Sequence, residues 1–261
     1  MIKQTHFSEK YGPWALVTGA SSGIGQEIAL QLAQHKLNIL LVGRNLRQLQ
    51  GTVEKIRALG VSAEVIQIDF DTPDAVETLI QATAPYQVGL LVPAAGFGDL
   101  GLFVNSDLST QQSMLTVNIS SVMALSHHFA KRMVQQKRGG IIFIASMLGF
   151  HGAPYSANYA ATKAYILSFG EALAVELKSS GVDVLVSSPG PTATGFGKRA
   201  GMNMGKAMTA QAVAAETIAA LGHSSKVLPG RMTKFLRGSL MTLPRFLQVR
   251  IIGKVMKRRA Q

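Results

Sequence analysis

Residues 18–25 read TGASSGIG, and this stretch decides the fold because of where it stands. It follows an apolar run of strand length and opens a segment with helical periodicity. Its three glycines permit a tight turn and a close approach of the backbone to a ligand. The free N–H groups at the start of the helix attract a pyrophosphate. A glycine-rich turn can also merely join a strand to a helix, but this βαβ context favours dinucleotide binding.

The same alternation of strand-length apolar runs and helical segments continues outward from this turn, which is typical of a parallel sheet covered on both faces. We expect strands at 14–18, 37–42, 63–68, 88–92, 140–145, 182–187 and 226–228, and helices at 23–35, 46–59, 73–84, 109–136, 156–180 and 209–221. No Pro/Ser-rich linker or internal repeat divides the series. The prediction is an α/β fold: one doubly wound (Rossmann) parallel sheet of about seven strands, with a single domain over residues 1–228.

A second group of polar residues follows in IIFIAS and YAATK. Ser146 ends a strand, and Tyr159 and Lys163 stand four apart, which puts both on one helix face. An ammonium beside a phenol favours the phenolate, so we expect a lowered pKa and proton transfer by Tyr159. Ser146 would hydrogen-bond the substrate oxygen, and Asn118 in TVNIS would hold a water that connects Lys163 to solvent. Each residue alone is ordinary, but their combination with the glycine turn predicts a catalytic set.

Two positions near the ends of the next strands bear on the cofactor. Arg44 offers a forked cation where an acidic residue would bind an unmodified ribose 2′-hydroxyl, so it favours a 2′-phosphate and NADP(H) over NAD(H). The alternative is a solvated loop residue. Asp69 either accepts the adenine amino group or caps the following turn.

Together these motifs resemble the short-chain dehydrogenase/reductase family over about residues 13–228: TGxxxGIG, Asn, Ser, YxxxK and a following PG stand in order. The resemblance implies an NADP-dependent enzyme that acts on CH–OH and C=O groups by hydride transfer. It places Gly19, Ser21, Ser22, Ile24, Arg44, Asp69 and Gly96 at the adenine half of the cofactor. It places Pro189, Gly190, Thr192 and Thr194 at the nicotinamide carboxamide, and Tyr159 and Lys163 at the nicotinamide ribose.

One departure from the family pattern is PAAG, with Ala94 and Ala95 where the family usually has NNAG or NAG. The Asn that would brace the sheet is missing, which bears on local stability and ribose placement. The wider pattern, including GRN after the second strand, is similar to the branch with fatty-acyl-chain and hydroxysteroid-type oxidoreductases.

Residues 191–208 are rich in Gly and Met and lack periodicity, which predicts a mobile loop over the ligand site. With Ser146, the side chains expected to contact an apolar substrate are Met147, Leu148, Phe150, Met202 and Met204. Equally, these side chains would pack against the loop or another subunit.

The charge is concentrated in a C-terminal extension, predicted to span residues 229–261. Of 26 Lys and Arg, ten lie in residues 226–261 with no Asp or Glu, which leaves 16 basic and 14 acidic residues before them. Apolar residues recur there at near-helical spacing, and Pro244 is expected to start a second helix. Three interpretations stay open: a packed terminus with a solvated basic face, a peripheral membrane helix, or a docking patch for an acidic partner.

The sequence lacks the motifs of several other classes of enzyme and of nucleic-acid-binding proteins. The chain has no cysteine, no GxSxG and no HExxH, so we expect no thiolate chemistry, serine hydrolase or metal site. The basic tail has two aromatic residues and no recognised motif for nucleic acid.

Cytoplasmic residence is the default without a signal peptide or spanning segment. The resemblance implies a homodimer or homotetramer, through helices 109–136 and 156–180. A non-catalytic NADP-binding regulatory or scaffold protein is the alternative function.

Overall fold

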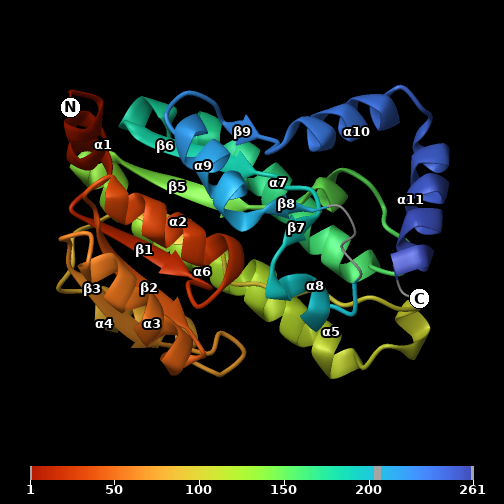
Figure 1. Ribbon diagram of the computed structural model, residues 1–261, viewed down its shortest axis with the longest axis horizontal. Helices are drawn as coiled ribbons and strands as arrows, with labels where there is room; N and C mark the ends of the chain where they lie inside the picture. Colours follow the sequence, from red (N-terminus) through yellow and green to blue (C-terminus); the bar gives the residue numbers. More distant parts are fainter. Residues whose placement is uncertain (1, 203–206, 260–261) are drawn as a thin grey trace.

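The computed structural model describes residues 2–202 and 207–259, and its core is one parallel sheet. The strand order is β3-β2-β1-β4-β5-β6-β9, with every pairing parallel (Figure 1). The strands are β1 (Trp14–Thr18), β2 (Asn38–Gly43), β3 (Ala63–Gln67), β4 (Val88–Pro93), β5 (Gly139–Ile144), β6 (Val182–Ser187) and β9 (Lys226–Val227). The predicted doubly wound sheet is confirmed.

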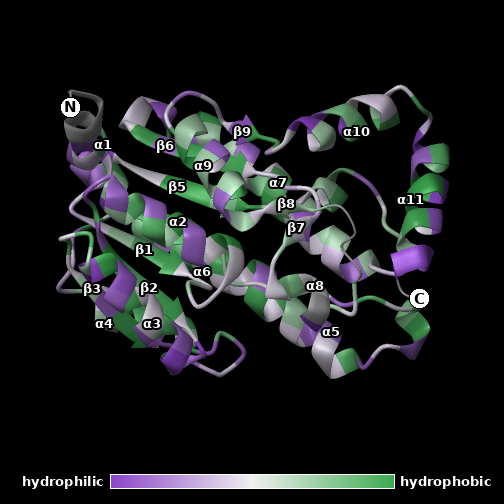
Figure 2. Ribbon diagram, in the orientation of Figure 1, coloured by the Kyte–Doolittle hydropathy of each residue, from purple (hydrophilic) through white to green (hydrophobic). Residues whose placement is uncertain are grey.

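Helices cover both faces of the sheet, because alternate residues of each strand point to opposite sides. Leu16, Leu40 and Leu91 belong to one apolar cluster, and their neighbours in sequence belong to the other. The first cluster is closed by α4 (Ala75–Thr83), α6 (Ser121–Gln136) and α7 (Ala157–Glu176). The second is closed by α2 (Gly23–Gln34), α3 (Leu46–Arg57) and α9 (Ala210–Ala220). Figure 2 shows the apolar strands enclosed between these helices.

The strand order reverses direction between β1 and β4, since the chain first winds outward through β2 and β3 and then continues on the other side of β1. The loops after β1 and β4 therefore diverge and leave a crevice at the carboxyl edge of the sheet. In open α/β sheets this crevice is the usual ligand site.

Several elements differ from the sequence prediction. The helix expected at 109–136 is divided into α5 (Leu108–Leu115), a π-helical turn η2 (Thr116–Ser120) and α6. A helix that was not predicted, α1 (Ile2–Tyr11), packs beside β4 and β5. The segment expected as a mobile loop contains β7 (Thr192–Ala193) paired with β8 (Met208–Thr209), and a short helix α8 (Gly195–Arg199).

The basic tail forms two helices, α10 (Arg231–Met241) and α11 (Arg245–Arg259), and α11 begins directly after Pro244 as expected. The two helices lie at one end of the molecule, beyond β9 (Figure 1). Within the described residues, no helix has both the length and the apolarity needed to cross a bilayer. Short 3₁₀ turns complete the chain: η1 (Phe103–Asn105), η3 (Met147–Phe150) and η4 (Lys178–Ser180).

Candidate active site

A cavity of about 1010 Å³ occupies the crevice at the carboxyl edge of the sheet. It runs from the glycine turn after β1 to the two tail helices. Every residue predicted from sequence for the cofactor lines it: Gly19, Ser21, Ser22, Ile24, Arg44, Asp69, Gly96, Tyr159, Lys163, Pro189, Gly190, Thr192 and Thr194. The predicted residues are thus brought together from separate segments of the chain.

Two glycines of the turn that opens α2 have no room for a side chain. Gly19 has a φ of +65°, and a Cβ there would lie 2.9 Å from the backbone of Ala94 and Ala95. A Cβ on Gly25 would lie 2.6 Å from the carbonyl oxygen of Gly19. The turn lines the cavity at the amino end of α2, where Ser22 makes no side-chain cap hydrogen bond, which fits a pyrophosphate.

Arg44 and Asp69 meet at the far end of this half of the cavity. Their nearest charged atoms, Arg44 Nη1 and an Asp69 carboxylate oxygen, are 3.7 Å apart, and the Arg44 side chain is 67% exposed. Such a long, exposed ion pair holds the guanidinium only weakly. Asp69 also accepts a hydrogen bond from the Asp71 N–H at 3.1 Å. It therefore caps the turn that follows it, which is one of the two roles predicted for it.

The missing Asn of the PAAG stretch is partly replaced by a neighbouring side chain. Thr18, at the end of β1, accepts a hydrogen bond from the Ala95 N–H through its hydroxyl oxygen at 2.9 Å. Thr18 is itself buried. The junction of β1 and β4 is therefore fastened by a side-chain hydrogen bond that the PAAG sequence did not lead us to expect.

Asn118 lies within the π-helical turn, a geometry often found at functional sites. Its side-chain oxygen accepts from the Phe97 N–H at 3.0 Å, and its amide donates to the Phe97 carbonyl at 2.8 Å and to the Thr162 hydroxyl at 3.2 Å. These bonds fasten the loop after β4 to helix α7. The Asn118 side chain thus positions neighbouring backbone, and the predicted water link to Lys163 stays a prediction.

Tyr159 and Lys163 are both buried on the face of α7 that meets the cavity. The Lys163 ammonium lies 5.7 Å from the centre of the Tyr159 ring and donates to the Ile144 carbonyl at 2.8 Å. Burial lowers the pKa of Lys163 to about 8. Burial likewise raises the pKa of Tyr159 to about 12, although a hydrogen bond with Ser146 lowers it. The lowered pKa expected for Tyr159 is wrong for the cofactor-free protein, because desolvation of the phenolate outweighs the hydrogen bond from Ser146.

Ser146 caps the turn η3, where its hydroxyl oxygen accepts from the Leu148 N–H at 3.2 Å. Beyond it, the second half of the cavity is apolar. Its wall includes Met147, Leu148 and Met202 as predicted, and also side chains that sequence reasoning did not single out: Phe196, Leu236, Leu240, Ile251, Ile252, Val255 and Met256. Phe150 does not line the cavity among the described residues but packs on the sheet core, and Met204 lies outside the described residues.

The tail therefore closes the cavity. Leu240, Ile252 and Met256 are buried in one apolar cluster with Ala160 of α7 and Met202. Near-helical spacing predicted the two helices but gave no indication of which residues of the body they would contact.

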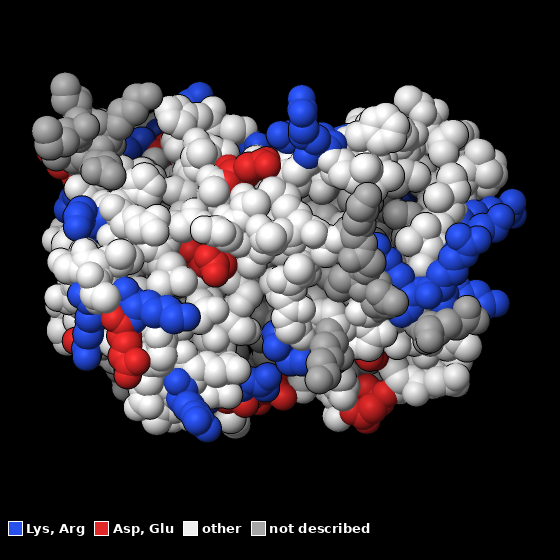
Figure 3. Space-filling model, in the orientation of Figure 1, with Lys and Arg blue, Asp and Glu red and all other residues white. Residues whose placement is uncertain are grey.

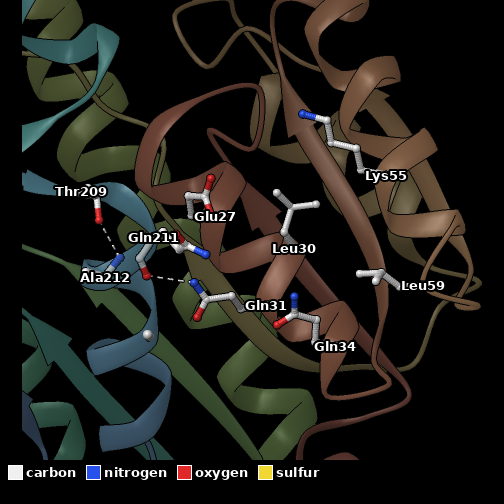
Figure 4. A pocket seen from close by; sticks show the side chains of 10 residues that line it. Glu27, Leu30, Gln31, Gln34, Lys55, Leu59, Thr209, Gln211 and Ala212 are labelled. Atoms are coloured by element: carbon white, nitrogen blue, oxygen red, sulfur yellow. Dashed lines mark hydrogen bonds between the residues drawn. The ribbon is translucent and has the colours of Figure 1, made fainter.

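A second hollow, of about 650 Å³, lies between α2, α3 and the start of α9 (Figure 4). Glu27, Gln31 and Gln34 line it, and the Gln31 side-chain amide donates to the Gln211 carbonyl at 2.9 Å. Tyr159 and Lys163 line the larger cavity and not this hollow.

Comparison with known proteins agrees with this geometry. A family model described as short chain dehydrogenase matches residues 13–204. The chain belongs to the short-chain dehydrogenase family. As a member of that family it is an oxidoreductase acting on CH–OH or C=O groups.

Among its relatives, a 7beta-hydroxysteroid dehydrogenase of Collinsella aerofaciens is 31% identical over 234 residues, covering 87% of this chain and 89% of that protein. A 17-beta-hydroxysteroid dehydrogenase type 3 of Rattus norvegicus is 34% identical, covering 70% and 61%. A solved structure from work on 7beta-hydroxysteroid dehydrogenase stereoselectivity has a TM-score of 0.88 at 29% identity, covering 94% of this chain and 98% of that one. A short-chain dehydrogenase of Sphingobium yanoikuyae in complex with NADPH has a TM-score of 0.79 at 27% identity, covering 90% and 97%.

Proposed function

We propose that this protein is an NADP(H)-dependent oxidoreductase that interconverts a ketone and a secondary alcohol on a bulky apolar substrate of steroid-like shape. The observation that carries the proposal is the composition of one cavity. A glycine-rich turn at the start of a helix lies at one end, and an apolar wall lies at the other. Tyr159 and Ser146 line the same cavity. The similarity to hydroxysteroid dehydrogenases supports the substrate shape.

The glycine turn, Arg44 and residues 189–194 would hold the cofactor, which supplies or accepts the hydride when bound. The Ser146 oxygen accepts from the Leu148 N–H. Its hydroxyl hydrogen, which bonds Tyr159 in the free protein, would turn to the substrate oxygen. Tyr159, with a pKa of about 12, is protonated near neutral pH and donates its proton to the carbonyl oxygen as hydride reaches the carbonyl carbon. In alcohol oxidation the Tyr159 phenolate takes the proton of the alcohol hydroxyl as hydride leaves the carbinol carbon for the cofactor.

Lys163 has a positioning and charge-balancing role. Its amine is fixed by the Ile144 carbonyl, and its pKa of about 8 leaves part of the population neutral in weakly alkaline solution. A charged Lys163 favours the tyrosinate that forms when Tyr159 gives up its proton.

We assign the preference for NADP(H) to Arg44. Residues 43–45 read Gly-Arg-Asn at the end of β2. None of them has a carboxylate that could accept a hydrogen bond from a ribose 2′-hydroxyl. The weakly held guanidinium can instead make paired hydrogen bonds to a 2′-phosphate. The NADPH complex of the similar Sphingobium yanoikuyae enzyme is consistent with this assignment.

The test is titration with NADPH and NADH by fluorescence, followed by NADPH oxidation with hydroxysteroid-derived ketones, bulky aryl ketones, quinones and acyl thioesters. Tyr159→Phe keeps the ring and removes the hydroxyl that would donate the proton, so we expect a kcat lower by about 100- to 10,000-fold. NADPH affinity should fall by no more than about tenfold, because at most one hydrogen bond to the nicotinamide ribose is lost. Tight NADPH binding with no turnover on any substrate would favour the non-catalytic alternative. Failure to bind either cofactor would overturn the proposal.

A further inference from the structure

Helix α11 has two unlike faces. Val249, Ile252 and Met256 face the body, where Ile252 and Met256 are buried. Phe246, Arg250, Lys254, Lys257 and Arg258 recur at helical spacing on the opposite side and are all exposed. The outer face of α11 is therefore a row of four cations with one aromatic ring.

These cations have no counterions in the described protein. None of the four lies within 4.0 Å of an acidic side chain among the described residues. The sequence has no Asp or Glu after residue 225. Figure 3 shows the resulting band of Lys and Arg atoms over α11 at the edge of the molecule. A patch of one sign without protein counterions attracts anionic partners.

Exposed apolar side chains lie beside the cationic face. Leu102, Phe103 and Val104, in and before the turn η1, are exposed by 53%, 59% and 86%. The nearby residue Leu100 packs in the same cluster as Ile252 and Met256, so this loop borders α11. Figure 1 places both at the same end of the molecule. We call this area the end surface: Leu102, Phe103, Val104, Phe246, Arg250, Lys254, Lys257 and Arg258.

The acidic groups of the neighbouring loop are already engaged. Asp99 accepts from the Gln111 side chain at 2.8 Å, and Asp107 caps α5 by accepting from the Thr110 N–H at 2.8 Å. Their hydrogen bonds do not involve the α11 cations. The end surface thus combines cations with exposed apolar groups.

The substrate half of the cavity is also reached at this end. Ile251 and Val255 line the cavity and are 40% and 46% exposed, so they belong both to its wall and to the outside of α11. A ligand that leaves the cavity beside α11 therefore meets the apolar side chains of Ile251 and Val255, together with Arg259, which also lines the cavity.

We propose that the end surface docks on the anionic face of a lipid bilayer. The cations meet lipid phosphates, and Phe103, Val104 and Phe246 enter the interfacial layer, which combines electrostatic attraction with apolar burial. A second copy of the chain is disfavoured as the occupant, because a two-fold interface would press the same four unpaired cations of each copy together. The docking does not depend on the reaction proposed above, although it would let apolar substrates pass from bilayer to cavity.

The experiment is co-sedimentation of the full chain with phosphatidylcholine vesicles, with and without phosphatidylglycerol, over a series of salt concentrations. We expect binding only with phosphatidylglycerol and a steep loss with salt. The triple variant Lys254→Gln/Lys257→Gln/Arg258→Gln should lower the partition coefficient on the order of 100-fold, since each cation near such a surface contributes about 1 kcal/mol. Phe103→Ser should lower it about tenfold through lost apolar burial.

Matched controls distinguish vesicle binding through the end surface from nonspecific electrostatic or apolar binding elsewhere on the protein. Arg47→Gln/Lys55→Gln/Lys131→Gln removes the same charge from exposed positions on α3 and α6, and Val175→Ser removes an exposed apolar side chain of α7. Both controls should bind vesicles nearly as the parent does. Circular dichroism and NADPH affinity check that every variant is folded.

Three results would overturn the proposal. One is absence of binding to phosphatidylglycerol vesicles at low salt. Another is binding that the controls reduce as much as the end-surface variants do. The third is a vesicle-independent oligomer, seen by sedimentation velocity, that the end-surface variants dissociate, because the surface would then bind a second copy. If the protein reduced ketones but did not bind vesicles, the docking proposal would fail and the proposed oxidoreductase function would still stand.

Discussion

The two ends of the large cavity, to which we assign the cofactor and the substrate, are built in different ways. The cofactor end is backbone: at Gly19 and Gly25 a Cβ would fall within 3 Å of main-chain atoms. The substrate end is a wall of side chains from the body and from two helices far along the sequence, among them Leu240, Ile252 and Met256. A backbone site tolerates almost no change at a few positions, whereas a side-chain wall tolerates many changes of modest effect.

The largest expected effect comes from adding one methyl group at the cofactor end. Gly19→Ala would place a Cβ 2.9 Å from the backbone of Ala94 and Ala95 at a φ of +65°. We expect a loss of unfolding free energy of about 2–4 kcal/mol and NADPH affinity lower by at least about 100-fold. Chemical denaturation measures the unfolding free energy, and fluorescence titration measures the NADPH affinity.

The control is the same change in the tail. At Gly238, inside α10, an added Cβ would have no atom within 4 Å, so Gly238→Ala should leave NADPH affinity unchanged and stabilise the helix by roughly 0.5–1 kcal/mol. Equal losses in the two variants would contradict the contrast between the two ends.

This contrast also explains what the sequence could predict. The glycine turn, Ser146, Tyr159 and Lys163 form short motifs whose spacing is fixed by one turn or one helix, and the structure brings them to one cavity. Strand-length apolar runs predicted the seven-stranded sheet because buried parallel strands must be apolar on both faces.

The remaining features depend on contacts between distant segments. Nothing local indicates that Ile252 would meet Met202, that Thr18 would bond the Ala95 N–H, or that the helix expected at 109–136 would contain a π-helical turn. The pKa of Tyr159 was also missed, because the degree of burial is a property of the whole fold. Segment 191–208 lacks periodicity since its elements are only two to five residues long.

The next effect concerns the substrate wall. Ile252 is buried and lines the cavity, so Ile252→Ala should cost about 3 kcal/mol of unfolding free energy. We expect KM for a bulky ketone to rise about tenfold through lost apolar contact, with NADPH affinity unchanged. Steady-state kinetics at saturating NADPH gives the KM.

Phe246 provides the matched control on the same helix, since it is 59% exposed and does not line the cavity. Phe246→Ala should leave both KM and stability close to those of the parent. A KM for Ile252→Ala equal to that of the parent would show that the tail does not shape the substrate site.

A pH effect follows from Lys163, which lies between the two ends. Its pKa falls from 10.5 in an unfolded chain to about 8 in the fold, so between these values the unfolded chain binds one more proton. Unfolding free energy therefore rises with pH over this window, by about 2–3 kcal/mol between pH 8 and 10. Above pH 10 the raised pKa of Tyr159 acts in the opposite direction.

Denaturation of cofactor-free protein at a series of pH values measures this slope. Lys163→Met keeps the buried chain without the amine, so its unfolding free energy should lack that rise between pH 8 and 10. A slope that persists in Lys163→Met would assign the proton to another group.

The smallest expected effect on stability is at Arg44, an exposed residue of the cofactor end that we expect to tolerate substitution. Arg44 is exposed and paired only at 3.7 Å, so Arg44→Gln should leave the unfolding free energy within about 0.5 kcal/mol of the parent. The loss of paired bonds to a 2′-phosphate should weaken NADPH binding by about 2 kcal/mol, or roughly 30-fold. NADH has no such phosphate, so its affinity should stay the same.

Fluorescence titration of both cofactors against the parent and Arg44→Gln gives the four affinities that decide this prediction. A parallel loss for NADPH and NADH would show that Arg44 acts on the shared part of the cofactor. No loss for either would make Arg44 the solvated loop residue of the alternative interpretation. A loss for NADPH alone would place the choice of cofactor in one exposed side chain, at the edge of a site whose centre is fixed backbone.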